Sequence, residues 1–186
     1  MITVQNREDF LFNLRTFLPL DCCAAELGVL HGDFSKQILD VIKPKTFYLI
    51  DPYSISESRY GTSLTSLTTA YSNDEDYSKI LKRFECEITT KQVSIIKKMS
   101  YEAVIDFPDQ SLDFNYIDAS HLYKDVKQDL NDWLPKLKPH GLMCGHDYIE
   151  SDTFGVIQAV DEFIEEHELE MIILNENGGD WALRKK

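Results

Sequence analysis

Five short apolar runs alternate with helix-like segments along this chain, and this alternation limits the possible folds more than any other feature. The runs lie at residues 22–28, 46–51, 93–97, 112–118 and 142–148. A strand followed by a helix and another strand predicts parallel pairing, because the helix returns the chain to the same end of the sheet. Apolar runs without polar alternation are typical of strands covered on both faces. We therefore expect an α/β fold with a mostly parallel sheet and helices on both faces.

The segments between these runs carry apolar side chains at helical spacing. Helices are expected over residues 33–41, 77–88, 123–137 and 156–167, and over an N-terminal segment, residues 1–20. Near the C-terminus, residues 170–174 and 180–184 predict two strands joined by a turn with two adjacent glycines. This hairpin predicts that the last strand runs antiparallel, at one edge of the sheet.

The length of 186 residues suits one domain, which we expect to span residues 1–186. Residues 52–73 are rich in Ser, Thr and Tyr and show no clear period, so we expect a lid or specificity loop there. Residues 1–10 carry charges and lack the apolar core of a signal peptide, and no run has the length of a membrane span. We expect a cytoplasmic protein without a membrane partner, and a homodimer is compatible with these features.

The net charge of −13 limits the class of partner. A field of this sign repels phosphate backbones, and the sequence has no basic stripe, so nucleic acid is not an expected partner. A cationic cofactor would be attracted instead. The polar and aromatic side chains of residues 52–73 suit a small-molecule acceptor, although they select none.

Four of the five apolar runs carry an acidic residue at their end. Ligands of open α/β sheets bind beyond the carboxyl ends of the strands, so the residues at these ends are the first candidates for a site. They are Glu26, Gly28, Asp51, Met99, Ser100, Asp118, His146 and Asp147. Capping of the following helices is an alternative role for the carboxylates. Helix capping accounts less well for a set of carboxylates that all lie at one edge of one sheet.

The turn after the first run contains Gly28 and Gly32, and Asp51 follows at a distance of about 20 residues. Glycine allows a tight turn and the close approach of a ligand. An acidic residue at this distance is typical of contact with a ribose diol. The pattern predicts a cofactor that contains a nucleoside. A tight G-x-G-x-x-G loop is absent, which argues against a pyrophosphate and therefore against nicotinamide or flavin dinucleotides.

Three segments resemble a known family. Residues 25–35, AELGVLHGDFS, resemble the first motif of class I S-adenosylmethionine (SAM)-dependent methyltransferases. Residues 117–141, IDASHLYKDVKQDLNDWLPKLKPHG, are similar to a block of the branch that contains macrocin-type O-methyltransferases and cephalosporin-hydroxylase-like proteins. Residues 145–148, GHDY, resemble the end of that branch's fifth strand. The resemblance covers about residues 20–185 and implies a Rossmann-like sheet of seven strands with the last strand reversed.

The resemblance implies SAM as the cofactor. The cofactor-binding positions that it implies are Glu26, Gly28, Gly32, Asp51, Met99, Ser100 and Asp118. Gly28 would lie under the methionine moiety with Glu26 near its amino group. Asp51 would hold the ribose hydroxyls, and residues 99–100 would flank the adenine. SAM carries a sulfonium and an ammonium, and both charges favour an acidic edge.

The resemblance also implies O-methylation of a hydroxyl. Macrocin-type relatives place a divalent cation between the fourth and fifth strand ends, where the matching positions are Asp118, His146 and Asp147. Two carboxylates and an imidazole could hold Mg²⁺ or a transition metal, and such an ion would lower the pKa of the acceptor hydroxyl. Relatives carry a carboxylate at the position of His146, and imidazole is a poor ligand for Mg²⁺. Either a transition metal binds here, or no metal binds and His121 or His146 acts as a base.

Three other functions compete with this interpretation. A nicotinamide-dependent Rossmann enzyme needs a pyrophosphate loop and does not explain the C-terminal hairpin. A methyltransferase-fold binding protein without catalysis has no need of the carboxylates at the strand ends. A nucleic-acid methyltransferase disagrees with the net charge and with the lack of an N-P-P-Y-type sequence after the fourth strand.

Overall fold

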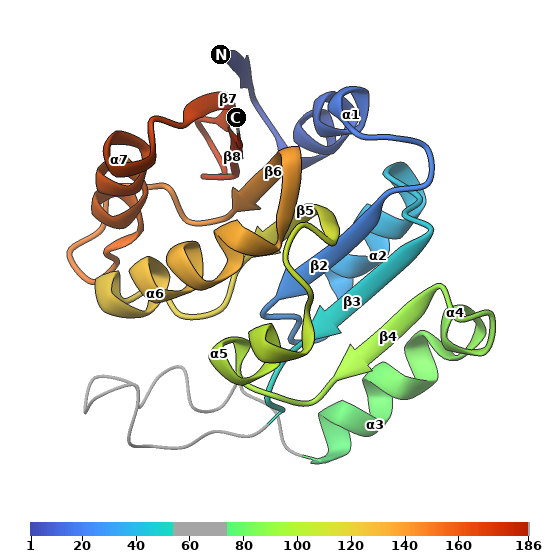
Figure 1. The fold of residues 1–186 in the computed structure, drawn as a ribbon. Coiled ribbons are helices and arrows are strands. Elements are labelled where there is room, and N and C mark those ends of the chain that lie inside the picture. Colours follow the sequence, from blue (N-terminus) through green and yellow to red (C-terminus); the bar gives the residue numbers. More distant parts are fainter. Residues whose placement is uncertain (54–73, 186) are drawn as a thin grey trace.

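The computed structural model describes residues 1–53 and 74–185 (Figure 1). Its strands form one eight-stranded sheet in the order β1-β7-β8-β6-β5-β2-β3-β4. They are β1 (Ile2–Val4), β2 (Cys23–Leu27), β3 (Thr46–Ile50), β4 (Val93–Ile96), β5 (Leu112–Ile117), β6 (Leu137–Gly145), β7 (Glu170–Asn175) and β8 (Trp181–Arg184). The loop predicted at residues 52–73 lies outside the described residues, apart from its first two positions.

Helices cover both faces of the sheet. They are α1 (Arg7–Phe17), α2 (Asp33–Val41), α3 (Asp74–Arg83), α4 (Glu85–Thr89), α5 (Ser100–Ala103), α6 (Tyr123–Trp133) and α7 (Val156–His167), with 3-10 turns η2 (Val104–Asp106) and η3 (Leu134–Lys136). The buried apolar side chains form two clusters. Helices α1, α2 and α3 contribute to one cluster, and α5, α6 and α7 to the other. Neighbouring strand residues such as Ala24 and Ala25 point into opposite clusters, which confirms the predicted α/β layering.

The last strand runs antiparallel to both of its neighbours, β6 and β7. The predicted reversal is therefore confirmed, but the predicted edge position is wrong. Strand β8 lies between β6 and β7, and its residues Trp181, Ala182 and Leu183 are buried. A hairpin pattern specifies the direction of the returning strand, but it does not specify which strand pairs with the outer side of that strand.

The N-terminal segment predicted as a helix over residues 1–20 begins instead with strand β1. This strand pairs in parallel with Ile173–Asn175 of β7, and so the sheet has eight strands rather than the predicted seven. Helix α1 starts after Asn6, whose side-chain oxygen accepts a hydrogen bond from the Asp9 N–H at 2.8 Å. A three-residue strand whose partner lies at the far end of the chain leaves no local signal in the sequence.

Two predicted helices also differ in extent. The helix predicted over residues 123–137 ends at Trp133, and strand β6 already begins at Leu137. The helix predicted over residues 77–88 is divided into α3 and α4, because Phe84 between them leaves the helical conformation. No helix in the described part of the chain is long and apolar enough to cross a membrane.

The carboxyl ends of β2, β3, β4, β5 and β6 meet at one edge of the sheet, because these strands are all parallel (Figure 1). The predicted site residues lie at these ends or in the segments that follow them. The fold therefore brings together residues that are far apart in the sequence.

Candidate active site

A cavity of about 250 Å³ opens at this edge of the sheet. Its wall comes from the ends of β2, β3 and β5, the start of α2, and helices α5 and α6. The predicted cofactor positions in the wall are Glu26, Gly28, Asp51, Met99, Ser100 and Asp118. Gly32 does not belong to the wall that the described residues form. A Cβ at Gly32 would instead meet the Phe84 ring at 2.7 Å, so this glycine serves helix packing.

The turn after β2 brings its backbone very close to the end of β5. Gly28 has a φ of +86°, and a Cβ there would lie 2.0 Å from the carbonyl oxygen of Asp118. The N–H of Gly28 donates to the Ile50 carbonyl at 2.9 Å, and the N–H of Asp118 donates to the Leu27 carbonyl at 2.8 Å. The packing of the protein's own backbone therefore requires glycine at this position.

Asp51 follows β3 and holds the same turn in place. Its Oδ2 accepts hydrogen bonds from the N–H groups of Val29 at 2.9 Å and Leu30 at 3.0 Å. Its Oδ1 accepts the Tyr53 N–H at 2.8 Å. A carboxylate has about four acceptor positions, so Asp51 can still accept a hydrogen bond from a ligand. Its contact with a ribose stays a prediction.

Glu26 lies at the end of β2 and is only 2% exposed. Its Oε2 has no hydrogen-bond partner among the described residues. Burial raises the pKa of Glu26 to about 8. A buried carboxyl oxygen without a partner is costly, and it favours a ligand that brings a cation or a hydrogen-bond donor into the cavity.

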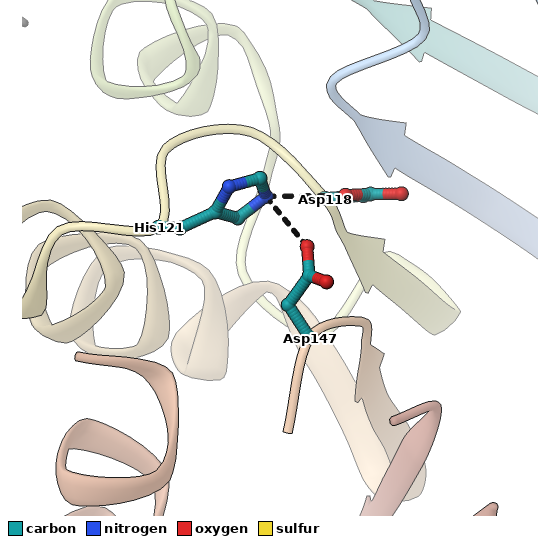
Figure 2. A group of neighbouring side chains, drawn as sticks. All are labelled: Asp118, His121 and Asp147. Atoms are coloured by element: carbon teal, nitrogen blue, oxygen red, sulfur yellow. Dashed lines mark hydrogen bonds and ion pairs between the residues drawn. The ribbon is translucent and has the colours of Figure 1, made fainter. Parts of the chain in front are cut away.

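Three side chains converge beside the cavity (Figure 2). Nε2 of His121 lies 2.9 Å from Oδ2 of Asp147 and 3.4 Å from Oδ1 of Asp118. One ligand atom from each of the three residues falls within 4.8 Å of the others, which suits a cation. Asp147 reaches the cluster from the turn after β6, where its backbone has a φ of 56°. Aspartate tolerates this left-handed conformation better than most residues.

The charges in this cluster stabilise one another. Burial alone would lower the pKa of His121, but hydrogen bonds to Asp118 and Asp147 outweigh it and raise that pKa to about 9. Burial opposes ionisation of Asp147, yet hydrogen bonds from His121 and His146 hold its pKa well below the usual range. At neutral pH the cluster therefore holds a positive charge between two carboxylates.

His146 lies next to this cluster. Its Nδ1 is 3.3 Å from Oδ2 of Asp147 and 3.9 Å from Oδ2 of Asp118. The structure thus brings the predicted metal set Asp118, His146 and Asp147 together. The tighter group, however, contains His121, which the sequence suggested only as a base. The loop between β5 and α6 turns His121 toward the carboxylates, and no periodic pattern predicts the course of a loop.

The cavity wall also contains residues that sequence reasoning missed. Arg7, at the start of α1, reaches it from outside the recognised motifs. Gln128 and Asp129 face it from α6, and Asp129 accepts a hydrogen bond from the Ser100 hydroxyl at 2.6 Å. The helical spacing of Asp125, Gln128 and Asp129 on the polar side of α6 is a signal that could have predicted the α6 residues. For Arg7 the sequence contains no such signal.

A family model described as a methyltransferase domain matches residues 25–148, which is more than half of the chain. The matched range includes the turn after β2, the end of β5 and the cluster of Asp118, His121 and Asp147. The chain belongs to the class I SAM-dependent methyltransferase family. The resemblance inferred from the motifs is thereby confirmed.

Solved structures of other methyltransferases share the fold. The O-methyltransferase NovP matches with a TM-score of 0.70 and 17% identity, covering 97% of this chain and 79% of its own. An O-methyltransferase from Bacillus cereus in complex with S-adenosylhomocysteine (SAH) matches with a TM-score of 0.63 and 12% identity, covering 97% and 80%. Precorrin-6y C5,15-methyltransferase from Geobacter metallireducens matches with a TM-score of 0.63 and 12% identity, covering 99% of this chain and 94% of its own. At these identities the likeness concerns the fold and does not select the acceptor.

A curated relative matches only part of this chain. Uncharacterized protein y4gI of Sinorhizobium fredii is 38% identical over 65 residues. That segment is 34% of this chain and 7% of y4gI, so the chain spans a small fraction of that relative's length.

The cavity of this chain has features that suit SAM, the cofactor of the family. Oε2 of Glu26, which has no partner among the described residues, suits an ammonium group. The acidic wall around it suits a ligand with two positive centres.

Proposed function

We propose that this methyltransferase transfers the methyl group of SAM to a hydroxyl oxygen of a small molecule. The observation that carries the proposal is the double position of Asp118. This residue lines the cofactor cavity and also belongs to the cluster with His121 and Asp147. The carboxylate of Asp118, which can attract a cation or a proton, therefore lies where the methyl acceptor would have to approach the cofactor.

The proposed role of the protein is mainly alignment. The sulfonium of SAM supplies an activated methyl group when the cofactor is bound. We assign Glu26 to the cofactor's ammonium, Asp51 to the ribose and residues 99–100 to the adenine. Holding donor and acceptor in line is worth several orders of magnitude in rate, without covalent participation of the protein.

We further propose that Asp118, His121 and Asp147 hold a divalent cation, with His146 adjacent to it. A mixed carboxylate and imidazole set favours Mn²⁺ or another transition metal over Mg²⁺. Such an ion would lower the pKa of the acceptor hydroxyl. The raised pKa of His121 argues against a direct base, because a protonated imidazole cannot accept the acceptor's proton at neutral pH. A cation would have to displace the same proton in order to bind.

Calorimetric titration with SAH and with NAD, followed by methyl transfer, tests the function. We expect SAH to bind at micromolar levels and NAD not to bind. Tritiated-methyl SAM should then label the hydroxyl compounds in a panel of phenols, catechols, sugars, hydroxy acids and amines, and esters of the same hydroxyls should stay unlabelled. Binding of NAD without SAH would contradict the cofactor assignment. Labelling of the panel's amines in place of its hydroxyls would contradict O-methylation.

Asp147→Asn is expected to weaken Mn²⁺ binding by about 10- to 100-fold, because it removes one of two carboxylate ligands. Wild-type affinity should also rise as the pH approaches 9, since the ion must displace the proton of His121. Calorimetry with Mn²⁺ alone measures both effects.

The matched control is Asp161→Asn, which removes a carboxylate that accepts a hydrogen bond from Tyr148 at 2.7 Å. Mn²⁺ affinity should not change in this variant. Equal affinity of wild type and Asp147→Asn would count against the cation, as would full turnover in excess chelator.

A further inference from the structure

We propose that Arg7 binds the carboxylate of the cofactor's amino-acid end, so that Arg7 and Glu26 together hold that zwitterion. The proposal deepens the proposed function and depends on SAM as the ligand. Arg7 lies outside residues 25–148, which the family model matches.

Arg7 and Glu26 reach the cavity from the same face of the sheet. Glu26 of β2 is in register with Tyr116 of β5, and Nη2 of Arg7 lies 3.3 Å from the Tyr116 hydroxyl. The guanidinium carbon of Arg7 is 4.3 Å from the ring centre of Phe34, in the first turn of α2. Both Arg7 and Phe34 line the cavity beside Gly28. The Arg7 guanidinium therefore lies at the end of the cavity that the methionine moiety of the cofactor is expected to fill.

The guanidinium is held in a fixed orientation from behind. Nε of Arg7 donates to Oδ1 of Asp180 at 2.9 Å, and the Tyr116 hydroxyl donates to the same oxygen at 2.5 Å. Asn175 donates to Oδ2 of Asp180 at 2.7 Å, and Asp180 is fully buried. This network leaves Nη1 of Arg7 without a hydrogen bond to any described residue. A planar guanidinium with free N–H groups matches the geometry of a carboxylate.

The charge of the cavity wall gives a second reason. The wall contains several carboxylates, among them Glu26, Asp51 and Asp118. A ligand carboxylate that enters such a cavity is repelled unless a cation receives it. Among the described residues of the wall, Arg7 is the one lysine or arginine side chain. The carboxylate of SAM therefore has one permanently charged partner available in this part of the chain.

Arg7 could instead have a purely structural role, in which it only neutralises the charge of Asp180. Ligands that differ only in the carboxylate separate the two roles. SAH carries both the ammonium and the carboxylate, decarboxylated SAH keeps the ammonium alone, and 5′-methylthioadenosine lacks both. Calorimetry with these three ligands measures the contribution of each group in wild type and in variants.

We expect wild type to prefer SAH over decarboxylated SAH by about 10- to 100-fold, as is typical of a hydrogen-bonded charge pair. Arg7→Met should abolish this preference and change the affinity for decarboxylated SAH by less than about threefold. Arg15→Met, on the same helix but outside the cavity wall, should keep the full preference. Arg7→Met/Asp180→Asn avoids an uncompensated buried charge, and it should show the same loss of preference if Arg7→Met alone folds poorly.

A preference for SAH that persists in the Arg7 variants would overturn the inference, because another group would then bind the carboxylate. Equal weakening of all three ligands would also overturn it and leave Arg7 a structural role. Failure of wild type to bind any of the three ligands is a different result, because it contradicts the proposed function itself.

Discussion

Glu26→Gln is expected to stabilise the cofactor-free protein at pH 9 and to weaken its binding of SAH. Burial raises the pKa of Glu26 from its usual 4.5 to about 8. The folded state therefore binds this proton more tightly than the unfolded state. The resulting stability is fully present below about pH 4.5 and is lost as the pH rises through about 8.

The size of the effect follows from the depth of burial. Between pH 5 and pH 9 the wild-type free energy of unfolding should fall by on the order of a few kcal/mol because of Glu26 alone. Glutamine keeps the shape of the side chain and has no proton to lose, so this fall should disappear in the variant. Urea denaturation of both proteins at pH 5, 7 and 9 measures the difference.

Binding should change in the opposite direction. The ammonium of SAH pairs with ionised Glu26, so wild-type affinity should rise between pH 6 and pH 8 as the proton becomes easier to release. At pH 8, Glu26→Gln should bind SAH about 10- to 100-fold more weakly. Calorimetry in buffers of different ionisation enthalpy counts the proton that wild type releases and the variant does not.

Glu162→Gln is the matched control. Glu162 lies on α7, and a hydrogen bond from the Tyr123 hydroxyl lowers its pKa to about 2. This variant should gain no stability at pH 9 and should bind SAH as wild type does. Stability gained together with binding lost marks Glu26 as a residue kept for a ligand. Loss of both in Glu26→Gln would show instead that the carboxyl supports the fold.

The sequence predicted those parts of the fold that have a strong local pattern. Helix α2 was predicted over residues 33–41 and has these limits, because glycine precedes it and the Lys43-Pro44 pair follows it. The reversed strand was predicted from the turn at residues 175–179. The insertion of β8 and the pairing of β1 could not be predicted, because both depend on contacts between distant segments.

The candidate site was predictable to the same degree. Residues that directly follow parallel strands, such as Asp51 and Asp118, must lie at one sheet edge, so their neighbourhood follows from the strand pattern. The closer approach of His121 to Asp147 depends on the course of two loops. Arg7 reaches the cavity because β1 and α1 pack at the end of the sheet that the C-terminal strands form. Spacing along the sequence predicts neither the course of these loops nor the packing of β1 and α1.

Gly28→Ala is expected to be the most destabilising single methyl addition in the site. Alanine at a φ of +86° costs about 1–2 kcal/mol in backbone strain alone. The new Cβ would also lie 2.0 Å from the Asp118 carbonyl oxygen and 2.8 Å from the Cα of Ala119. These are backbone atoms of the turn that directly follows β5, so relief of the contact must displace this turn and the end of the strand.

We therefore expect the melting temperature of Gly28→Ala to fall by roughly 10 °C, measured by circular dichroism. SAH binding should weaken as well, because the displaced turn carries Asp118 in the cavity wall. Gly141→Ala in β6 is the control, since its φ is not positive and its nearest contact would be 2.9 Å, to the Lys138 carbonyl oxygen. A smaller loss in Gly28→Ala than in Gly141→Ala would show that the ends of β2 and β5 can separate without cost, and that the glycine serves only the ligand.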